Sequence, residues 1–193
     1  MSPYFVVLLL CVGSSLAGQK GPKCQNGTLT PAMRQKIVDF HNKVRARLAK
    51  GLEEDVIKAA KISNLTWDCG LENEAEGAFT TENLTDVTKI KNHGYNEYVQ
   101  DGYDETAKIT YGKDLKPALR WWWNRQDISV PRHHILKHEG LMPFANMAND
   151  KNTKIGCTYK VDVIEGEKLL VFVCLYDKKL KVGDFIYELE LLK

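Results

Sequence analysis

The chain has 193 residues, with 27 basic against 25 acidic side chains and a formal net charge of +2. This length suits one domain that can bury a sizeable core. No basic tract or mixed aromatic and basic stripe stands out, which argues against a nucleic acid partner. A cationic cluster within residues 43–50 (Lys43, Arg45, Arg47 and Lys50) is expected to be the solvated face of a helix.

Residues 1–17 are predicted to be a signal peptide. No charged side chain occurs before residue 20, and residues 5–12 form an apolar run of eight. Such a run is too short to span a bilayer, which needs roughly 20 residues. Ser15 and Ala17 are small residues that suit cleavage after Ala17. We therefore expect residues 18–193 to be a single exported domain with no membrane span.

Cysteine usage agrees with export. Cys11 falls in the predicted signal peptide, which leaves Cys24, Cys69, Cys157 and Cys174. An even number of cysteines in an exported chain indicates disulfides, and three pairings are open. Zinc is the alternative, but no CxxC spacing pre-arranges a site for it. N-glycosylation is expected at one or more of three sequons, at Asn26, Asn64 and Asn83.

Three helices are predicted in the first two thirds of the chain. The first has Thr30 as N-cap, Pro31 as first residue and Gly51 at its end. Its apolar stripe is Met33, Ile37, His41, Val44 and Leu48. Since His41 lies on this stripe, we interpret it as a packed, hydrogen-bonded core histidine and not as a ligand.

The second helix opens within residues 67–72, and its buried stripe is Leu71, Ala75, Ala78 and Phe79. Asp114 is predicted to cap the third, in which Leu115, Ala118, Leu119, Trp122 and Gln126 share a face. Tryptophans at 121–123 span about 200° of a helix. At least one of them should therefore be partly exposed.

A short helix, a break and a hairpin are predicted between Pro143 and Tyr176. The helix shows Phe144, Met147, Ala148 and Lys151 at helical spacing. Residues 154–161 and 167–176 flank a polar turn over 162–166. Residues 169–175 are apolar on both faces, so this strand should be covered by helices on both sides. One cysteine lies on each strand, where a bridge could join the pair.

This segment resembles the signature of the CAP superfamily (cysteine-rich secretory proteins, antigen 5, pathogenesis-related 1; also SCP/TAPS). The matching residues are Phe144, Met147, Ala148, Ile155, Gly156, Cys157, Cys174 and Tyr176. Further matches are His41-Asn42, Trp67-Asp68-Cys69, Gly183-Asp184 and Ile186-Tyr187-Glu188, so the resemblance covers about residues 30–190. It is strongest to the activation-associated secreted proteins of parasitic nematodes. It implies an α+β fold, a three-layer α-β-α sandwich around a small antiparallel sheet.

The resemblance also implies the disulfide pairing. Cys157 should pair with Cys174 across the hairpin. In many CAP chains the cysteine near the position of Cys69 pairs with a third hairpin cysteine. That residue is absent here, near Val161, which leaves Cys24 as the partner of Cys69.

Many CAP domains have a cleft with two His and two Glu that can hold a divalent metal, and these ligands are replaced here. Tyr95 and Pro143 occupy two positions, and Asn124 or Arg125 a third, depending on the alignment. His93 lies too close to Gly94 to serve as the first histidine. A site that loses three of four ligands is not expected to hold its metal, so we predict no cofactor.

A replacement metal site is conceivable in the histidine-rich segment 131–140. If it were helical, His134 and His138 would share a face, with His133 and Glu139 nearby. A third fixed ligand is not apparent, so a solvated basic loop is the favoured interpretation. No Gly-x-Ser-x-Gly or His-Glu-x-x-His pattern occurs, and no enzyme activity is expected.

The resemblance implies a secreted, non-enzymatic protein that binds a host cell-surface protein, with integrin-type adhesion antagonism as the leading hypothesis. Candidate binding residues are Trp121, Trp123, His133, His134, Lys137 and His138. The alternative is a sterol or fatty-acid carrier, which would need an exposed apolar groove. Residues 182–184 (Val-Gly-Asp) are interpreted as a structural turn and not as an integrin-binding motif.

Overall fold

The computed structural model describes residues 21–190 except 54–55, 81–84, 103–107, 126–133 and 165–166. The predicted signal peptide, Gln126, Asn83 and His133 lie outside the described residues. In the described part, no helix is long and apolar enough to cross a membrane.

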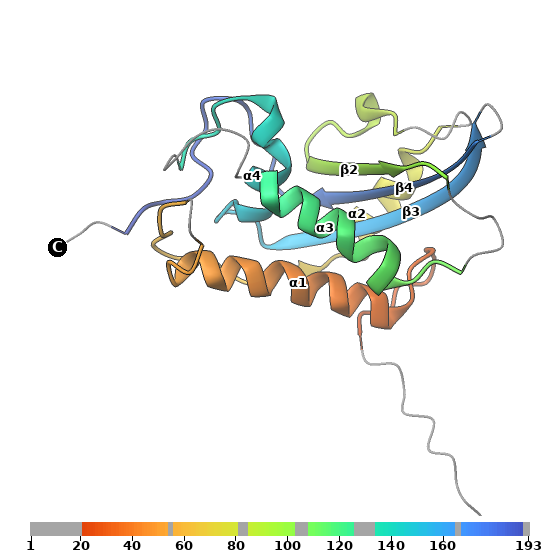
Figure 1. Ribbon diagram of the computed structural model, residues 1–193, viewed down its shortest axis with the longest axis horizontal. Coiled ribbons are helices and arrows are strands. Elements are labelled where there is room, and N and C mark those ends of the chain that lie inside the picture. Colours follow the sequence, from red (N-terminus) through yellow and green to blue (C-terminus); the bar gives the residue numbers. More distant parts are fainter. Residues whose placement is uncertain are drawn as a thin grey trace, which may run out of the picture.

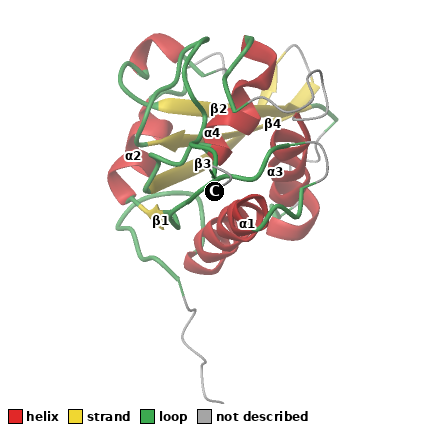
Figure 2. Cartoon of the chain, turned by 90° about the vertical axis from the view of Figure 1, so that its left-hand side faces the viewer, coloured by secondary structure: helices red, strands yellow, loops and turns green. Residues whose placement is uncertain are grey.

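A sheet lies between two layers of helices, as the sequence predicts (Figures 1 and 2). The helices are α1 (Pro31–Ala49), α2 (Cys69–Gly77), α3 (Lys116–Trp123) and α4 (Met142–Ala148). The strands are β1 (Thr66–Trp67), β2 (Gly94–Gln100), β3 (Lys154–Ile164) and β4 (Glu167–Tyr176). Short 3-10 turns occupy Val87–Lys89 and Glu139–Leu141, and a π-helical turn, Tyr111–Leu115, precedes α3.

The sheet has the order β1-β3-β4-β2 and is mixed, because β1 runs parallel to β3. The small antiparallel sheet that the resemblance implies is present as β3, β4 and β2, and β1 adds a short parallel pairing at its edge. Only Thr66 and Trp67 pair there, with Lys154 and Ile155. The chain then leads directly into α2, which packs across β3, so the direction of β1 follows from the path of the connection.

Strand β4 is buried on both faces, which confirms the prediction for residues 169–175. Leu170, Phe172, Cys174 and Tyr176 belong to the larger core with α1, α3 and α4. Val171, Val173 and Leu175 pack with α2. The alternation of a strand delivers successive side chains to opposite layers, and both layers here are apolar.

Three predicted boundaries differ from the structure. The hairpin turn is shorter than expected, because β3 continues to Ile164 and β4 begins at Glu167. Helix α4 ends at Ala148, so Lys151 lies beyond it. Helix α2 begins at Cys69, within the predicted range, behind Asp68, whose carboxylate accepts from the amides of Gly70 and Leu71. It ends at Gly77, so Ala78 and Phe79 of the predicted stripe lie beyond it.

The helix caps agree with the sequence at α1 and differ at α3. Thr30 Oγ1 accepts from Met33 N at 3.2 Å, and Gly51 adopts a φ of 67° at the end of α1. Asp114 is not the N-cap of the third helical segment, because Thr110 holds that position. The Asp114 carboxylate instead reaches back to the Thr110 amide at 2.5 Å, in the manner of a capping box.

Arg45 is buried, so the prediction of a solvated cationic face is wrong at this residue, while Lys43, Arg47 and Lys50 are exposed. Its guanidinium donates to the carbonyls of Ser63, Met147, Asn149 and Asn152 at 2.8–3.1 Å. Burial lowers the pKa of Arg45 to about 10. The planar fork of donors lets one charge bind several carbonyl dipoles, which compensates its loss of water.

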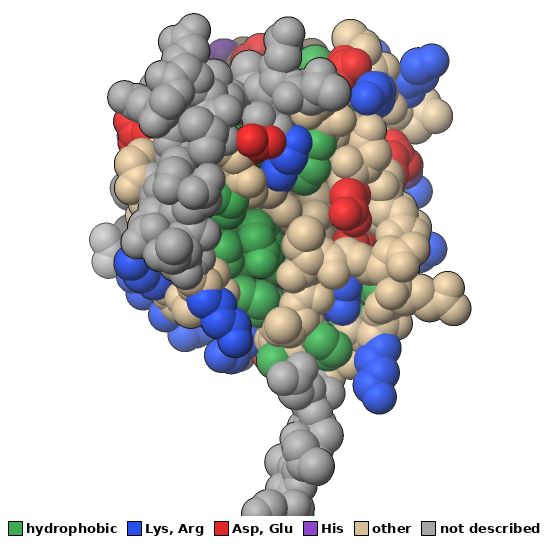
Figure 3. Space-filling model, turned by 90° about the vertical axis from the view of Figure 1, so that its right-hand side faces the viewer, with side chains coloured by type: hydrophobic (Ala, Val, Ile, Leu, Met, Phe, Trp, Pro, Cys, Tyr) green, Lys and Arg blue, Asp and Glu red, His purple; other side chains and the backbone are tan. Residues whose placement is uncertain are grey.

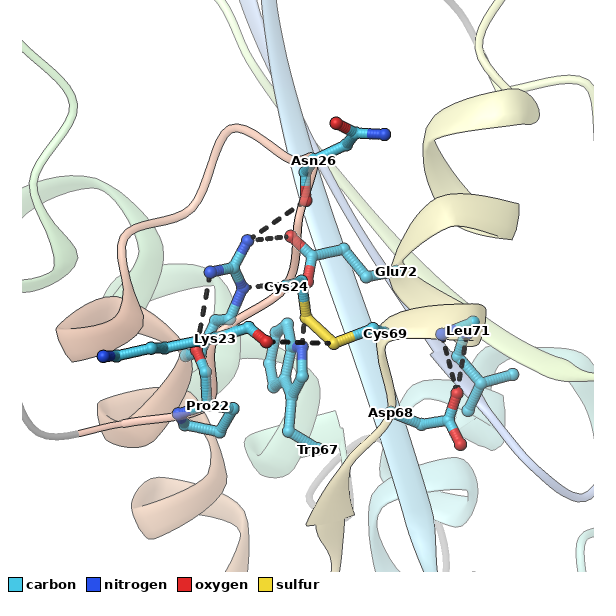
Figure 4. The surroundings of a disulfide bond; sticks show 11 residues. Pro22, Lys23, Cys24, Asn26, Trp67, Asp68, Cys69, Leu71 and Glu72 are labelled. Carbon is cyan, nitrogen blue, oxygen red and sulfur yellow. Dashed lines mark hydrogen bonds and ion pairs between the residues drawn. A yellow bond between two sulfur atoms is a disulfide. The ribbon is translucent and has the colours of Figure 1, made fainter.

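The structure contains both expected disulfides, Cys24–Cys69 and Cys157–Cys174. The first ties the N-terminal arm to the start of α2 (Figure 4). Beside it, the buried carboxylate of Glu72 accepts from both Arg34 (2.8 and 2.7 Å) and the Trp67 indole (2.9 Å). Each bridge is expected to contribute about 2–4 kcal/mol by restricting the unfolded chain.

Candidate functional site

An open cleft of about 510 Å³ lies where β2, the start of α4 and the segment 179–181 meet. Its lining includes His93, Tyr95, Glu97, Trp121, Glu139, Pro143, Asn146, Lys179 and Lys181. A cavity of this size is in the usual range for small-ligand sites and can equally receive a protruding side chain of a partner.

Strand β2 forms the wall of the cleft and is the edge of the sheet. Two of its outward carbonyls are capped by side chains. Tyr95 O accepts from Asn146 Nδ2 at 2.9 Å, and Glu97 O accepts from Trp122 Nε1 at 3.1 Å. These carbonyls are therefore not free to pair with an added strand, which leaves side chains as the recognition groups of the cleft.

A chain of buried hydrogen bonds runs from the cleft into α1. Asn146 Nδ2 donates to Asn96 Oδ1 (3.0 Å), and Asn96 Nδ2 donates to the Tyr176 hydroxyl (3.2 Å). The hydroxyl lies 3.0 Å from His41 Nε2, and His41 Nδ1 lies 2.9 Å from Ile37 O. With its proton on Nδ1, His41 donates to Ile37 and accepts from Tyr176, so every donor has an acceptor.

This network keeps its titratable members neutral. Burial lowers the pKa of His41 to about 4, while the hydrogen bond to Ile37 opposes that shift and the Arg45 charge adds to it. Burial also raises the pKa of Tyr176. The interpretation of His41 as a packed, hydrogen-bonded histidine is confirmed, since its side chain is fully buried. Asn96 and Asn146 were not identified from the sequence. Asn146 interrupts the otherwise apolar α4, but β2 also carries Glu97 and Gln100, so nothing distinguishes Asn96 there.

Two polar atoms of cleft-lining residues are buried without a hydrogen-bond partner. They are Asn146 Oδ1 and His93 Nδ1. The other ring nitrogen of His93 lies 3.2 Å from Glu74 Oε2. Buried polar atoms are usually satisfied, so these two are positions at which water or a ligand group is expected to bind.

The residues present do not fit the divalent metal that the fold family implies. Pro143 has no donor atom, and burial together with Glu97 and Glu139 raises the pKa of Tyr95, which keeps its phenol protonated. Asn124 is exposed, and the Arg125 guanidinium lies 3.5 Å from the centre of the Trp121 ring. His93 does line the cleft, but no third ligand atom accompanies it and Glu74 within 4.8 Å among the described residues.

In the part of the chain that the structure describes, one group brings three metal-ligand atoms within 4.8 Å of one another. It consists of Cys24, Cys69 and Glu72. Its two sulfurs are joined in the disulfide, and the Glu72 carboxylate is held by Arg34 and Trp67. This group is therefore a structural cluster that ties the N-terminal arm to α2 (Figure 4).

The three tryptophans have different surroundings. Trp121 is 43% exposed and lines the cleft, which confirms that at least one is partly exposed. Trp122 is fully buried and stacks on Phe172 at 5.2 Å. Trp123 is 4% exposed, packs against Phe144 and donates to Glu53, so it offers a partner much less surface than Trp121 does.

Residues 134–138 are not helical, so the condition for a metal site on one helix face is not met, and the favoured interpretation of a loop agrees with their conformation. His134 O accepts from Ile186 N (2.7 Å), and Leu136 N donates to Asp184 O (2.9 Å). The neighbouring residues Phe185 and Leu189 form isolated bridges with Ile135 and Ala59. The His134 ring is half-buried and stacks on Phe185 at 5.2 Å.

Of the other binding candidates in this segment, Lys137 is exposed and His138 is half-buried. The turn at 182–184 has the expected structural role, since Gly183 adopts a φ of 98° and donates to Leu136 O at 2.8 Å. The sequons at Asn26 and Asn64 are exposed, which leaves both side chains accessible to glycosylation.

Fold and site together define a small disulfide-braced α-β-α domain with an open cleft at the edge of its sheet. Residues 38–176 match the CAP family, described as the cysteine-rich secretory protein family, and the chain belongs to this family. The resemblance found in the sequence is thereby confirmed.

Individual relatives agree with this assignment. The chain is 28% identical over 185 residues to Ancylostoma secreted protein from Ancylostoma caninum, a match that covers 91% of this chain and 42% of that protein. The chain thus spans about two fifths of the length of this relative. BmVAL-1 superposes with a TM-score of 0.72 at 25% identity, covering 87% of each chain. A structure titled hookworm platelet inhibitor superposes with a TM-score of 0.58 at 23% identity, covering 86% of this chain and 80% of that one.

Proposed function

We propose that the protein is secreted, is not an enzyme and binds a host cell-surface protein through the mouth of the cleft at Trp121. The observation that carries this proposal is the half-exposed Trp121 ring with the Arg125 guanidinium stacked on it at 3.5 Å. Tyr98 packs edge-on against the same ring at 5.9 Å and holds it in place. Tryptophan, tyrosine and arginine carry a disproportionate share of binding energy at protein interfaces.

The chemistry around the cleft supports binding over catalysis. Its lining asparagines, Asn96 and Asn146, are hydrogen-bonded to a tyrosine and a histidine behind them that are buried and neutral. Two positions that hold metal ligands in other members of the fold family are Tyr95 and Pro143 here. A relative named as a secreted protein and a structural neighbour named as a platelet inhibitor favour export and action on a host cell. Antagonism of an integrin is the narrower form of this proposal.

Adhesion of platelets and neutrophils to immobilised integrin ligands tests the proposal. Trp121→Ala and Arg125→Ala should each reduce inhibition by tenfold or more, in line with hot-spot truncations of about 2 kcal/mol. Leu52→Ala is the matched control, because Leu52 is an exposed hydrophobic residue (54%) that does not line the cleft. Full potency of both cleft variants would move the binding surface elsewhere. An inactive wild-type protein that also fails to bind host cells would refute receptor binding.

The metal-free character is tested in the same assay. Protein stripped with EDTA and exchanged back into the same cation-containing buffer should keep its potency, because Tyr95 and Pro143 supply no carboxylate or imidazole. The buffer is held constant since integrins need divalent cations themselves. Loss of potency on stripping, with recovery on addition of zinc, would contradict this part of the proposal.

Carriage of a sterol or fatty acid is the second candidate function. It is favoured by the 510 Å³ cleft. Hydrophobic side chains also gather near the middle of a different face, the one turned away from α4 (Figure 3). Organic extraction of protein purified from eukaryotic secretion, followed by mass spectrometry, should then yield stoichiometric lipid. Extracts without lipid, together with no uptake of a fluorescent sterol or fatty acid, would exclude this function.

A further inference from the structure

We propose that a group of lysines beside the cleft is a docking surface for a sulphated polysaccharide. We call this group the basic rim and define it as Lys91, Lys137, Lys178, Lys179 and Lys181. This proposal concerns a second partner and does not depend on the receptor proposed above.

The centre of the basic rim is the segment Asp177-Lys-Lys-Leu-Lys-Val182. Leu180 is 8% exposed and anchors the segment in the core, while the three lysines around it are exposed. The backbone is fixed on both sides of Lys178, because Lys178 N donates to Asn152 Oδ1 (2.9 Å) and Lys178 O accepts from Gly94 N (3.0 Å). Short lysine-rich segments of this kind are typical of polyanion-binding patches.

Two further segments, distant in sequence, bring lysines to the same place. Lys179 Nζ donates to the carbonyl of the exposed Lys91 at 3.1 Å. On the other side, Leu136 accepts from Gly183 N at 2.8 Å, which places the exposed Lys137 beside the end of the segment. The tertiary structure thus gathers cations that a net charge of +2 for the whole chain does not reveal.

The carboxylates within this segment are occupied by backbone amides. Asp177 accepts from Thr153 N and Lys154 N at 2.9 and 3.0 Å, and its nearest contact to Lys178 Nζ is 3.9 Å. Asp184 accepts from Lys181 N at 3.0 Å. Among the described residues, no carboxylate lies within 4 Å of the ammonium groups of the other four rim lysines. These ammonium groups are available to an external anion.

The arrangement of the rim favours a linear polyanion. Its lysines come from three segments that meet beside the cleft, and two of them, Lys179 and Lys181, line it. A flexible chain of sulphates can follow such a surface better than a flat bilayer can. Glu97 and Glu139 line the cleft itself, so the polymer is expected along the rim and not inside the cleft. Binding should be driven by release of counterions and should therefore weaken steeply with salt.

Binding to immobilised heparin, measured between 50 and 300 mM NaCl, tests the inference. The wild-type protein should bind, and the triple variant Lys178→Ala/Lys179→Ala/Lys181→Ala should lose at least tenfold in affinity. The slope of log Kd against log salt concentration should also be smaller for this variant. The decrease should correspond to the loss of up to about three contacts between lysine and sulphate. The matched control is Lys43→Ala/Lys50→Ala/Lys61→Ala, which removes the same charge from exposed positions outside the rim. It should bind within twofold of wild type.

Thermal unfolding of both triple variants shows whether a loss of binding comes from a loss of folding. Chemically desulphated heparin should bind neither the wild-type protein nor the control variant. Equal losses in the rim and control variants would show a mere net-charge effect and overturn the proposal. So would wild-type protein that does not bind heparin at 150 mM NaCl. Binding to anionic phospholipid vesicles without binding to heparin would assign the rim to membranes instead.

Discussion

Protonation of His41 should destabilise the protein between pH 6.5 and pH 4. Burial lowers the pKa of this imidazole from 6.5 to about 4, because the folded protein has no water around the ring. The unfolded chain then binds a proton in this interval that the folded chain does not bind. The stability that depends on neutral His41 is fully present above pH 6.5 and is lost as the pH falls toward 4.

The magnitude follows from the difference between the two pKa values. A difference of 2.5 units, from 6.5 to about 4, corresponds to about 3 kcal/mol at 1.36 kcal/mol per unit. The hydrogen bonds agree with this sign. A protonated ring would donate from both nitrogens, and the Tyr176 hydroxyl would then receive donors from His41 and Asn96 and lose its own acceptor.

The assay is urea unfolding of the oxidised protein at several pH values from 7.5 to 4, for wild type and for His41→Gln. Glutamine can accept the Tyr176 hydrogen bond but does not titrate. The variant should be less stable at pH 7.5, and the gap between the two proteins should narrow by about 3 kcal/mol toward pH 4. The other histidines and all carboxylates are shared, so their contributions cancel in the difference. A gap that stays constant across this range would refute the assignment of a buried neutral imidazole.

Three further outcomes are expected. Arg45→Lys should lower the free energy of unfolding in urea by at least about 2 kcal/mol, because buried carbonyls lose their donors. Arg47→Lys on the exposed face should change the same free energy by less than about 1 kcal/mol, and equal effects would contradict the burial of Arg45. Trp122→Ala should cost about 3–5 kcal/mol by leaving a cavity beside Phe172, and a calorimetric transition unchanged from wild type would show that this packing is wrong. Protein secreted from eukaryotic cells should shift on a gel after glycosidase treatment, and the shift should be smaller in Asn26→Gln, Asn64→Gln or both; no shift in wild type would exclude N-glycans.

Much of the fold could be predicted because its signals are local. Thr30 and Pro31 specify the start of α1 through hydrogen bonds and dihedral angles that involve only the first turn. The apolar run of β4 predicts cover on both faces, whichever helices supply it. The matches at Cys157 and Cys174 placed the hairpin and, through the family resemblance, its disulfide.

The misses share a different cause. Asp114 has the chemistry of an N-cap, yet Thr110 takes that position four residues earlier and Asp114 reaches back to its amide. At residues 134–138 the spacing left a helical metal pair open as the less favoured alternative, and extended pairing with residues 184–186 excludes it. In each case two local structures compete, and a contact outside the predicted element selects between them.

The sequence by itself determined the α1 boundaries and the doubly covered strand, since periodicity and capping act over a few residues. Its resemblance to the CAP superfamily implied the family and the three-layer class. Only the tertiary structure decided which polar and aromatic side chains face water. The sequence around Arg45 predicts an exposed charge, but its guanidinium is buried among carbonyls of residues 102 to 107 positions further along the chain. Trp121 and Trp123 are two positions apart, yet one lines the cleft and the other packs on Phe144. The basic rim, likewise, exists only because three loops distant in sequence meet, and burial of a side chain depends on such partners more than on its neighbours in the chain.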